Sequence, residues 1–281
     1  FFVPRDFAIF YPLFVDEITP KVALWPGIFL TAFTVTTVVM ARRSTSYLLG
    51  WLWFLGTMVP VVGLIQVGSQ SHADRYLYIP TIGLAVWIPF AVSSVSGLLG
   101  RILRPIWLTA TAISLTMLTW VQVSYWADGV TLFRHSTEVT GDCMTSVICL
   151  AGSYCRNERP QEAVAYLSTK ILVAKNPGNK ARLKSLKASA LAQIGDDKAA
   201  YDLGKEAVDE GCGDLATLLT VATAAYKLDF LDEAEAYLKQ AKVAPLGQWS
   251  SPSMRGPVEM RETVGEFMYI LAKRRQELSA R

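Results

Sequence analysis

An adjacent acid and base, Asp74 and Arg75, stand alone between two long apolar runs of the chain. Neither residues 44–71 nor residues 76–100 contain any Asp, Glu, Lys or Arg. A full charge placed against a bilayer costs about 2.5–3.5 kcal/mol on insertion scales, so such a residue is rarely accidental. Two interpretations stay open: the pair turns the chain around in the headgroup layer, or it forms a polar site at the mouth of a membrane bundle.

The chemistry that this loop offers is the binding of a phosphate at headgroup depth. The Arg75 guanidinium is always charged, and its planar set of donors matches phosphate oxygens in two-point contact. Asp74 can orient that guanidinium, while Tyr76 and Tyr78 can supply hydroxyl contacts at the same depth. If Arg75 is only an interfacial anchor, its charge merely reaches the lipid headgroups, and Lys would serve as well.

The cysteines give a weaker chemical signal. Cys143, Cys149 and Cys155 recur every six residues and fall on different faces of a helix, and Cys212 stands apart. No CxxC pair occurs, so we expect no zinc or other metal site. Buried apolar thiols are favoured, and one disulfide stays open if the compartment is oxidising. The chain has no phosphate-binding glycine loop or dinucleotide fingerprint, so we expect no cofactor.

Long apolar segments must position the loop. Four segments have the roughly twenty residues needed to cross about 30 Å of hydrocarbon: 22–41, 47–67, 77–98 and 105–126. Because a helix satisfies its own backbone hydrogen bonds in lipid, we predict a transmembrane helix for each, kinked at Pro60 and Pro89. The aromatic, proline-broken residues 1–20 suit the membrane interface, so the predicted membrane domain is 1–126.

Arginines predict the orientation of this membrane domain. The links at 41–46 and 99–104 contain bases and no acid; their bases are Arg42, Arg43, Arg101 and Arg104. The positive-inside rule therefore places both links in the cytoplasm. The loop around Arg75 and everything after Trp126 then lie on the non-cytoplasmic side of the membrane.

A helical repeat is predicted for residues 127–281. The segments QEAVAYL, KAAYDLG and DEAEAYL begin at residues 161, 198 and 232, at intervals of 37 and 34 residues. Tetratricopeptide repeats (TPRs) are about 34 residues long and place small residues where their paired helices touch. Alanines fit both small positions with an offset of twelve residues in each unit: Ala151 and Ala163, Ala188 and Ala200, Ala222 and Ala234. A TPR-like α-solenoid is favoured over a generic bundle of helical hairpins.

The flanks of the repeats also follow a helical pattern. Turns are expected at Gly195 and near Asn157, and Pro177 and Pro245 follow second helices. Segment 127–139 is predicted as an unpaired helix that feeds the array. Segment 258–278 is predicted as a terminal helix with one apolar side made of Val264, Phe267, Met268 and Leu271.

Composition agrees with two domains of different kinds. Hydrophobic residues make up 52% of the chain and charged residues 18%. Residues 1–125 hold seven Lys or Arg and four Asp or Glu, so twenty of each sign remain in residues 126–281. A nucleic-acid-binding domain would be basic, and that class is excluded. The expected fold class is all-α: a polytopic transmembrane helix bundle followed by the TPR-like α-solenoid.

The run ADRYLYIP at residues 73–80, followed by TIGL, resembles a late membrane loop of lipid-dependent glycosyltransferases that carry TPRs. These include the transmembrane and TPR-containing O-mannosyltransferases of animals and their bacterial relatives. The resemblance extends upstream through FLGTMVPVVGLIQVGSQ and downstream to WADGVTLFRH, and it covers most of the chain.

This resemblance implies transfer of a sugar from a polyprenyl-phosphate donor to an acceptor on the non-cytoplasmic side. Asp74 and Arg75 carry over only as candidate donor-site residues, and the repeats would bind an acceptor or partner protein. Such relatives have their catalytic base in an early loop, so no residue here is assigned as catalytic. Because residue 1 is Phe, we expect the C-terminal part of a longer membrane protein. The alternative is a non-catalytic membrane anchor that displays repeats for protein–protein interaction.

Overall fold

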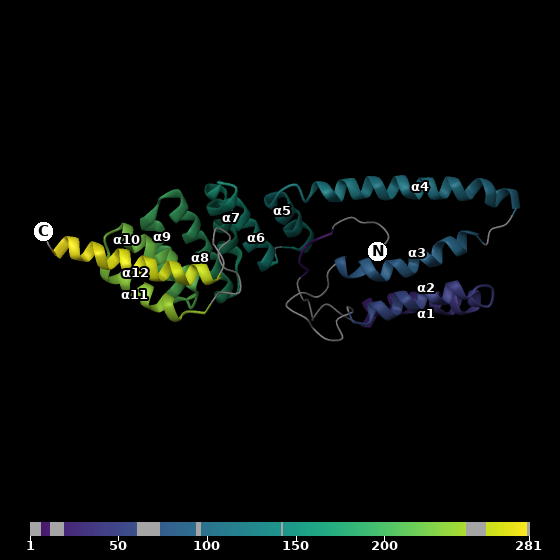
Figure 1. Cartoon of the computed structure of the whole chain (residues 1–281), viewed down its shortest axis with the longest axis horizontal. Helices are drawn as coiled ribbons and strands as arrows, with labels where there is room; N and C mark the ends of the chain where they lie inside the picture. The colour runs from purple at the N-terminus through teal and green to yellow at the C-terminus, as the bar shows by residue number, and fades with distance from the viewer. Residues whose placement is uncertain are drawn as a thin grey trace. The chain divides into compact units, whose positions relative to one another are not determined.

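The structure, a computed structural model, is α-helical in the residues that it describes, apart from loops and the 3-10 turn at Asp74–Leu77 (Figure 1). It describes residues 7–11, 20–60, 74–93, 97–141, 143–245 and 257–279. The predicted all-α class is therefore confirmed for these residues. The chain divides into two compact units, residues 1–143 and residues 144–281.

The first unit contains the apolar half of the chain. Its helices are α1 (Pro20–Ala41), α2 (Thr45–Met58), α3 (Tyr78–Ser93), α4 (Gly97–Ser124) and α5 (Gly129–Thr140). Helix α5 corresponds to the helix predicted at 127–139, and it begins with an N-cap, because Asp128 accepts hydrogen bonds from the backbone of Val130 and Thr131.

Among the described residues, two helices of this unit are long and apolar enough to cross a membrane, judged by length and composition. They are Leu24–Ala41 within α1 and Gly100–Ser124 within α4, and almost none of their side chains are buried. The segments predicted at 47–67 and 77–98 form shorter helices in the described residues, with 14 residues in α2 and 16 in α3. Helix α2 ends at Met58, and residues 61–67 of the predicted span lie outside the described residues, so the kink at Pro60 stays a prediction. Val59, the residue before Pro60, keeps helical φ and ψ of -49° and -50°, so the usual effect of a proline on its preceding residue does not explain that end. The kink at Pro89 stays a prediction.

Aromatic rings and two glycines hold α1, α2 and α3 together. The Phe33 ring of α1 lies 4.7 Å from that of Trp51 on α2 and 5.0 Å from that of Trp87 on α3. A Cβ atom added to Gly83 would lie 2.3 Å from the carbonyl oxygen of Gly50. Helices α2 and α3 therefore approach at backbone contact, which only glycine permits at these two positions.

The second unit is built from three helical hairpins and a final helix (Figure 1). The hairpins are α6 (Met144–Arg156) with α7 (Pro160–Val173), α8 (Pro177–Ile194) with α9 (Asp197–Asp209), and α10 (Leu215–Lys227) with α11 (Leu231–Val243). Local signals set their ends: Pro160 and Pro177 stand in first turns, and Gly195 ends α8 with a left-handed φ of 92°.

The alanines of the predicted register form the seams of these hairpins. Ala151 is 1% exposed, and the other five are 0% exposed: Ala163, Ala188, Ala200, Ala222 and Ala234. In each hairpin, one buried alanine of the first helix and one of the second are thus twelve residues apart, and α8 to α11 bury further alanines beside them. The predicted burial of all six is confirmed.

Helix α12 (Pro257–Ser279) covers the last hairpin. Val264 and Leu271 are buried in the same core cluster as α10 and α11, with Phe267 and Met268 packed against it. The apolar side predicted for the terminal helix is therefore confirmed. Arg274 adds an ion pair at 2.6 Å to Asp229, in the turn between α10 and α11.

Candidate functional site

The four residues predicted to bind a phosphate lie on two consecutive turns. Asp74, Arg75 and Tyr76 belong to the 3-10 turn η2 (Asp74–Leu77), and Tyr78 begins α3. The Tyr76 side chain is 36% exposed and that of Tyr78 is 79% exposed. The side chains of Asp74 and Arg75 lie outside what the structure describes, so phosphate binding by Arg75 stays a prediction.

Helix α2 fixes the backbone that carries these residues. The indole Nε1 of Trp53 donates a hydrogen bond of 3.1 Å to the carbonyl oxygen of Ile79 in the first turn of α3. The Thr81 hydroxyl donates to the carbonyl of Tyr78 at 2.9 Å. The Gly50–Gly83 contact lies just beyond. The turn is therefore attached to a packed helix pair at its C-terminal end.

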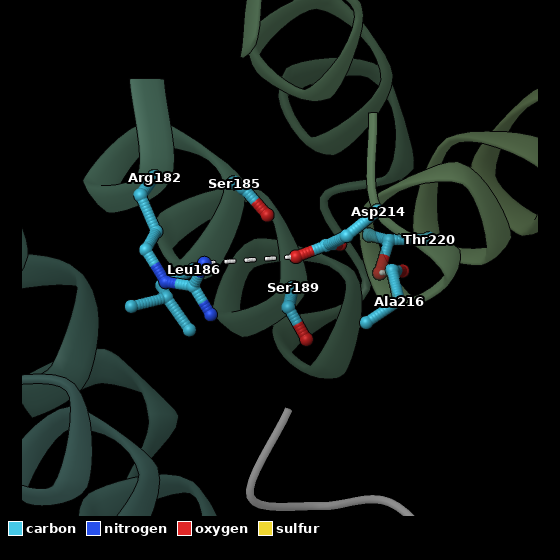
Figure 2. Close-up of a pocket in the computed structure, with 7 residues that line it drawn as sticks. All are labelled: Arg182, Ser185, Leu186, Ser189, Asp214, Ala216 and Thr220. Carbon is cyan, nitrogen blue, oxygen red and sulfur yellow. Dashed lines mark hydrogen bonds and ion pairs between the residues drawn. The ribbon is translucent and has the colours of Figure 1, made fainter. Parts of the chain in front are cut away.

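A second candidate site lies in the repeat unit, on the first helices of the hairpins. These helices pack on one another in order, α6 on α8 and α8 on α10. Figure 2 shows a hollow where α8 meets α10, with hydroxyl groups and one ion pair around it. Its lining residues are Arg182, Ser185, Leu186, Ser189, Asp214, Ala216 and Thr220.

Asp214 is the centre of this site. Its Oδ1 caps α10 by accepting hydrogen bonds from the backbone N–H of Thr217 at 2.9 Å and from its hydroxyl at 2.6 Å. Its Oδ2 lies 4.0 Å from Nη1 of Arg182, and Figure 2 shows that side chain reaching from α8 toward α10. The Ser185 and Thr217 hydroxyls lie 2.6 Å apart. These contacts form a series of polar side chains that joins α8 to α10.

The hollow is small, and the thiol next to it is held protonated. The hollow has a volume of about 10 Å³, which is room for about one water molecule. The nearby Cys212 sulfur lies 3.7 Å from the Thr217 hydroxyl, and burial raises the pKa of its thiol. A thiol held protonated is a poor nucleophile.

Lys184 supports the site from the opposite side of α8. Its side chain is only 7% exposed and donates to Glu206 at 2.8 Å and to Glu210, both on or next to α9. Burial opposes the charge of Lys184, but the hydrogen bonds to the two carboxylates outweigh it and raise its pKa. This buried cation keeps α8 and α9 in a fixed register.

Metal and disulfide chemistry find no support in the described part of the chain. No group of three or more His, Cys, Asp or Glu is placed there to hold a metal ion. None of the four cysteines forms a disulfide in the described residues, and all four are partly buried. No protein-family model and no curated protein matches the chain. A functional assignment therefore depends on the residues, on their geometry and on the resemblance of residues 73–80 to a membrane loop of TPR-containing glycosyltransferases.

The site on α8 and α10 was missed by sequence reasoning. One signal was present: Asp214 stands three residues before Thr217 at the start of an apolar run, a typical N-cap pattern. The pairing of Asp214 with Arg182 has no such signal, because it depends on how α8 packs against α10.

Proposed function

We propose that this chain is a membrane-anchored TPR-type repeat protein whose repeat unit binds a segment of an acceptor or partner protein. The observation that carries the proposal is the alanine register of the three hairpins. In each hairpin an alanine of the first helix and an alanine twelve residues later in the second helix are 0–1% exposed, and this repeated spacing of small residues is typical of TPR units. Such stacks present an extended concave surface, lined by first helices, to their ligands.

The membrane anchor is supported by the exposed apolar helices of the first unit. A core helix of a soluble protein of this length would be mostly buried, whereas the apolar stretches of α1 and α4 are almost wholly exposed. Trp25 at 75% and Trp120 at 80% exposure lie near the ends of these stretches, where aromatic residues anchor helices at the interface. In the proposed bundle, α2 and α3 complete four spans, and the repeats lie on the non-cytoplasmic side.

The residues around the hollow between α8 and α10 support the proposal that a partner binds there. Hydroxyls of Ser185, Ser189 and Thr220 surround the Arg182–Asp214 pair along adjacent first helices. A polar wall with both charges suits an extended peptide, whose backbone offers donors and acceptors in alternation.

Photocrosslinking tests this proposal. A photoreactive amino acid at Ser189, which lines the hollow from α8, should form adducts with one partner protein in cells. The same amino acid at Asp202, on the exposed face of α9, should not. Arg182→Glu, which reverses charge at the hollow, should reduce the adduct at residue 189. Equal adducts at residues 189 and 202 would contradict binding along the first helices, and loss of the chain from membranes in alkaline carbonate would contradict the anchor.

The second candidate function is that of a glycosyltransferase with a polyprenyl-phosphate sugar donor, of which this chain forms part. It rests on the resemblance of residues 73–80 and on one observation. Tyr78 is 79% exposed at the first turn of an apolar helix, beside Arg75 and Tyr76. A lipid phosphate must sit at such a boundary while its tail stays in hydrocarbon.

Arg75→Lys separates this function from simple anchoring. The substitution keeps the charge but loses the planar donor set, so a phosphate clamp should fail. We expect a large loss of sugar transfer by the full-length protein with donor as the limiting substrate, at normal protein level and normal insertion. Unchanged transfer would reject the clamp and leave the loop as a structural turn.

A further inference from the structure

Helix α12 has the seam residues of a first helix, but no second helix of the described chain packs on them. In α10, a first helix, the buried Val221 directly precedes Ala222, which is 0% exposed in the seam with α11. In α12 the buried Leu271 precedes Ala272 in the same way, yet Ala272 is exposed. A Cβ atom added to Gly265, seven residues earlier, would have no atom within 4 Å. This side of α12 is therefore open where the hairpins are closed.

A hollow beside these residues lies between α11 and α12, which pack along each other (Figure 1). Its volume is about 320 Å³, against about 10 Å³ for the hollow between α8 and α10. Its lining residues are Glu235, Leu238, Met268, Leu271, Ala272 and Arg275. Because Ala272 belongs to this lining, a helix that packed on Ala272 would also cover the hollow.

The exposed side of α12 next to the hollow has the spacing of a coiled-coil seam. Gly265, Tyr269, Ala272 and Gln276 follow one another at intervals of four, three and four residues, which is the a/d spacing of a heptad. All four are exposed, and the Tyr269 side chain is 73% exposed. We call these four residues the α12 stripe. Small and large side chains alternate along it, so it offers both knobs and holes to a second helix.

Opposite charges flank the α12 stripe on one side. Glu266 and Lys273 lie on the same flank, seven residues apart, and both are exposed. Arg275, on the other flank, is already paired with Asp232 and Glu235 of α11. Flanking charges of a helix pair determine which partner and which orientation is favoured. In an antiparallel pair of two α12 helices, Glu266 of each copy lies beside Lys273 of the other.

We infer that the α12 stripe packs against the α12 stripe of a second copy of this chain, in antiparallel orientation. Two copies related by a two-fold axis present the same surface to each other, so that surface must complement itself. In the register that pairs Glu266 with Lys273, Tyr269 of each copy lies over Ala272 of the other, and Gln276 lies over Gly265. Each large side chain thus meets a small one, and each acid meets a base.

A parallel pair fits this side of α12 less well. It would bring the two Tyr269 rings into one layer and the two Ala272 methyl groups into another, where they would leave a gap. A helix of another protein could also cover the hollow, but the match of size and charge within the α12 stripe points to a second copy. The inference does not depend on what the hollow between α8 and α10 binds.

Disulfide crosslinking of the full chain tests the pairing. Two differently tagged copies are expressed together with their native cysteines replaced by alanine; one copy carries Gly265→Cys and the other Gln276→Cys. These positions lie eleven residues apart, which is about 16 Å along one helix, so only antiparallel pairing brings them together. We expect mild oxidation to join the two tags. Two copies with Ile270→Cys, which is exposed on another side of α12, should show only background crosslinking.

An exchange of charges tests the register. Lys273→Glu in both copies places an acid beside Glu266 of the other copy, so the yield of the disulfide between residues 265 and 276 should fall several-fold. Adding Glu266→Lys to both copies should restore that yield, because both ion pairs form again with exchanged signs. A substitution that only disturbed α12 would not be rescued in this way.

Each contrary result removes a definite part of the inference. A yield no higher than that of Ile270→Cys would show that α12 does not pair with itself. Disulfides between like positions, 265 with 265 or 276 with 276, would replace the antiparallel pair with a parallel one. Failure of the double exchange to restore the yield would overturn the register. A disulfide to a different protein, identified by mass spectrometry, would assign the hollow between α11 and α12 to that protein instead.

Discussion

Small residues determine how closely the helices of the repeat unit approach. Ala163 and Ala234 are each followed four residues later by a buried leucine, whereas Ala200 is followed by Gly204. A Cβ atom added to Gly204 would lie 2.6 Å from Cγ2 of Val221, so a valine from α10 occupies that space. The segment KAAYDLG therefore keeps the register of its neighbours while exchanging leucine for glycine.

The Cys155 thiol should react slowly with alkylating reagents, because burial holds it protonated. Burial raises its pKa from 9.0 to about 11, and the nearby Arg156 only partly offsets this. At pH 8 its thiolate fraction should therefore be about 100-fold lower than that of a thiol with the ordinary value. The rate of iodoacetamide labelling, followed by peptide mass spectrometry, should keep rising about tenfold per pH unit beyond pH 9.

Unfolding supplies the control for this prediction. In urea the Cys155 thiol is solvated, and its labelling should level off near the ordinary pKa. A native rate that levels off at the same pH as the unfolded rate would show that burial does not hold the thiol protonated.

At the scale of elements, the hairpin seams should tolerate no added volume. Ala200 is 0% exposed between α8 and α9, so Ala200→Leu should cost about 1–3 kcal/mol of unfolding free energy. Ala236→Leu on the exposed face of α11 should change it very little. Thermal unfolding of residues 127–281 expressed alone measures both, and equal melting temperatures would show that the alanine register is not a packed seam.

The contact between α2 and α3 makes a similar prediction in the apolar unit. Gly83→Ala would place a methyl group 2.3 Å from the Gly50 carbonyl and force the helices apart, at a cost of about 1–3 kcal/mol. Gly56 lies in α2, as Gly50 does, but a carbon added to it would have no atom within 4 Å. Gly56→Ala should therefore be tolerated. Thermal aggregation of the detergent-solubilised full chain distinguishes the two, and equal thresholds would argue against close packing of α2 on α3.

Helix ends could be predicted from sequence in the repeats but less well in the apolar half. Pro177 and Gly195 mark where α8 begins and ends, because their backbone preferences act locally. The apolar segment predicted at 47–67 holds no comparable signal before Pro60, so hydrophobicity alone does not indicate where its first helix ends. The α2 helix ends at Met58.

The two candidate sites also differ in how well the sequence alone predicted them. Sequence alone pointed to Asp74, Arg75, Tyr76 and Tyr78, because two charges in a long apolar region stand out. The pair formed by Arg182 and Asp214 did not stand out, because its members are separated by 32 residues in sequence and the second half is rich in both charges. Only the packing of first helices on one another brings that pair together.

At the scale of the whole molecule, the arginine links predict the same side for the repeats whether or not α2 and α3 span the membrane. Arg42 and Arg43 directly follow α1, and Arg101 lies in the first turn and a half of α4. If both links are cytoplasmic, the chain between them makes an even number of crossings, either none or two. In both cases α4 leads outward and residues 144–281 lie on the non-cytoplasmic side.

Single-cysteine variants of the full chain, with the native cysteines replaced, test this orientation. Cysteine at Arg43 or Arg101 should resist a membrane-impermeant maleimide in intact cells and react after permeabilisation. Cysteine at Asp202, exposed on α9, should react in intact cells. Asp202 is a better reporter than the native Cys212, because burial raises the pKa of that thiol and slows its labelling. Labelling of residue 43 but not residue 202 in intact cells would invert the topology. The repeats would then face the cytoplasm, and the loop at residues 74–78 would lie on the opposite side of the membrane from the one that a donor phosphate requires.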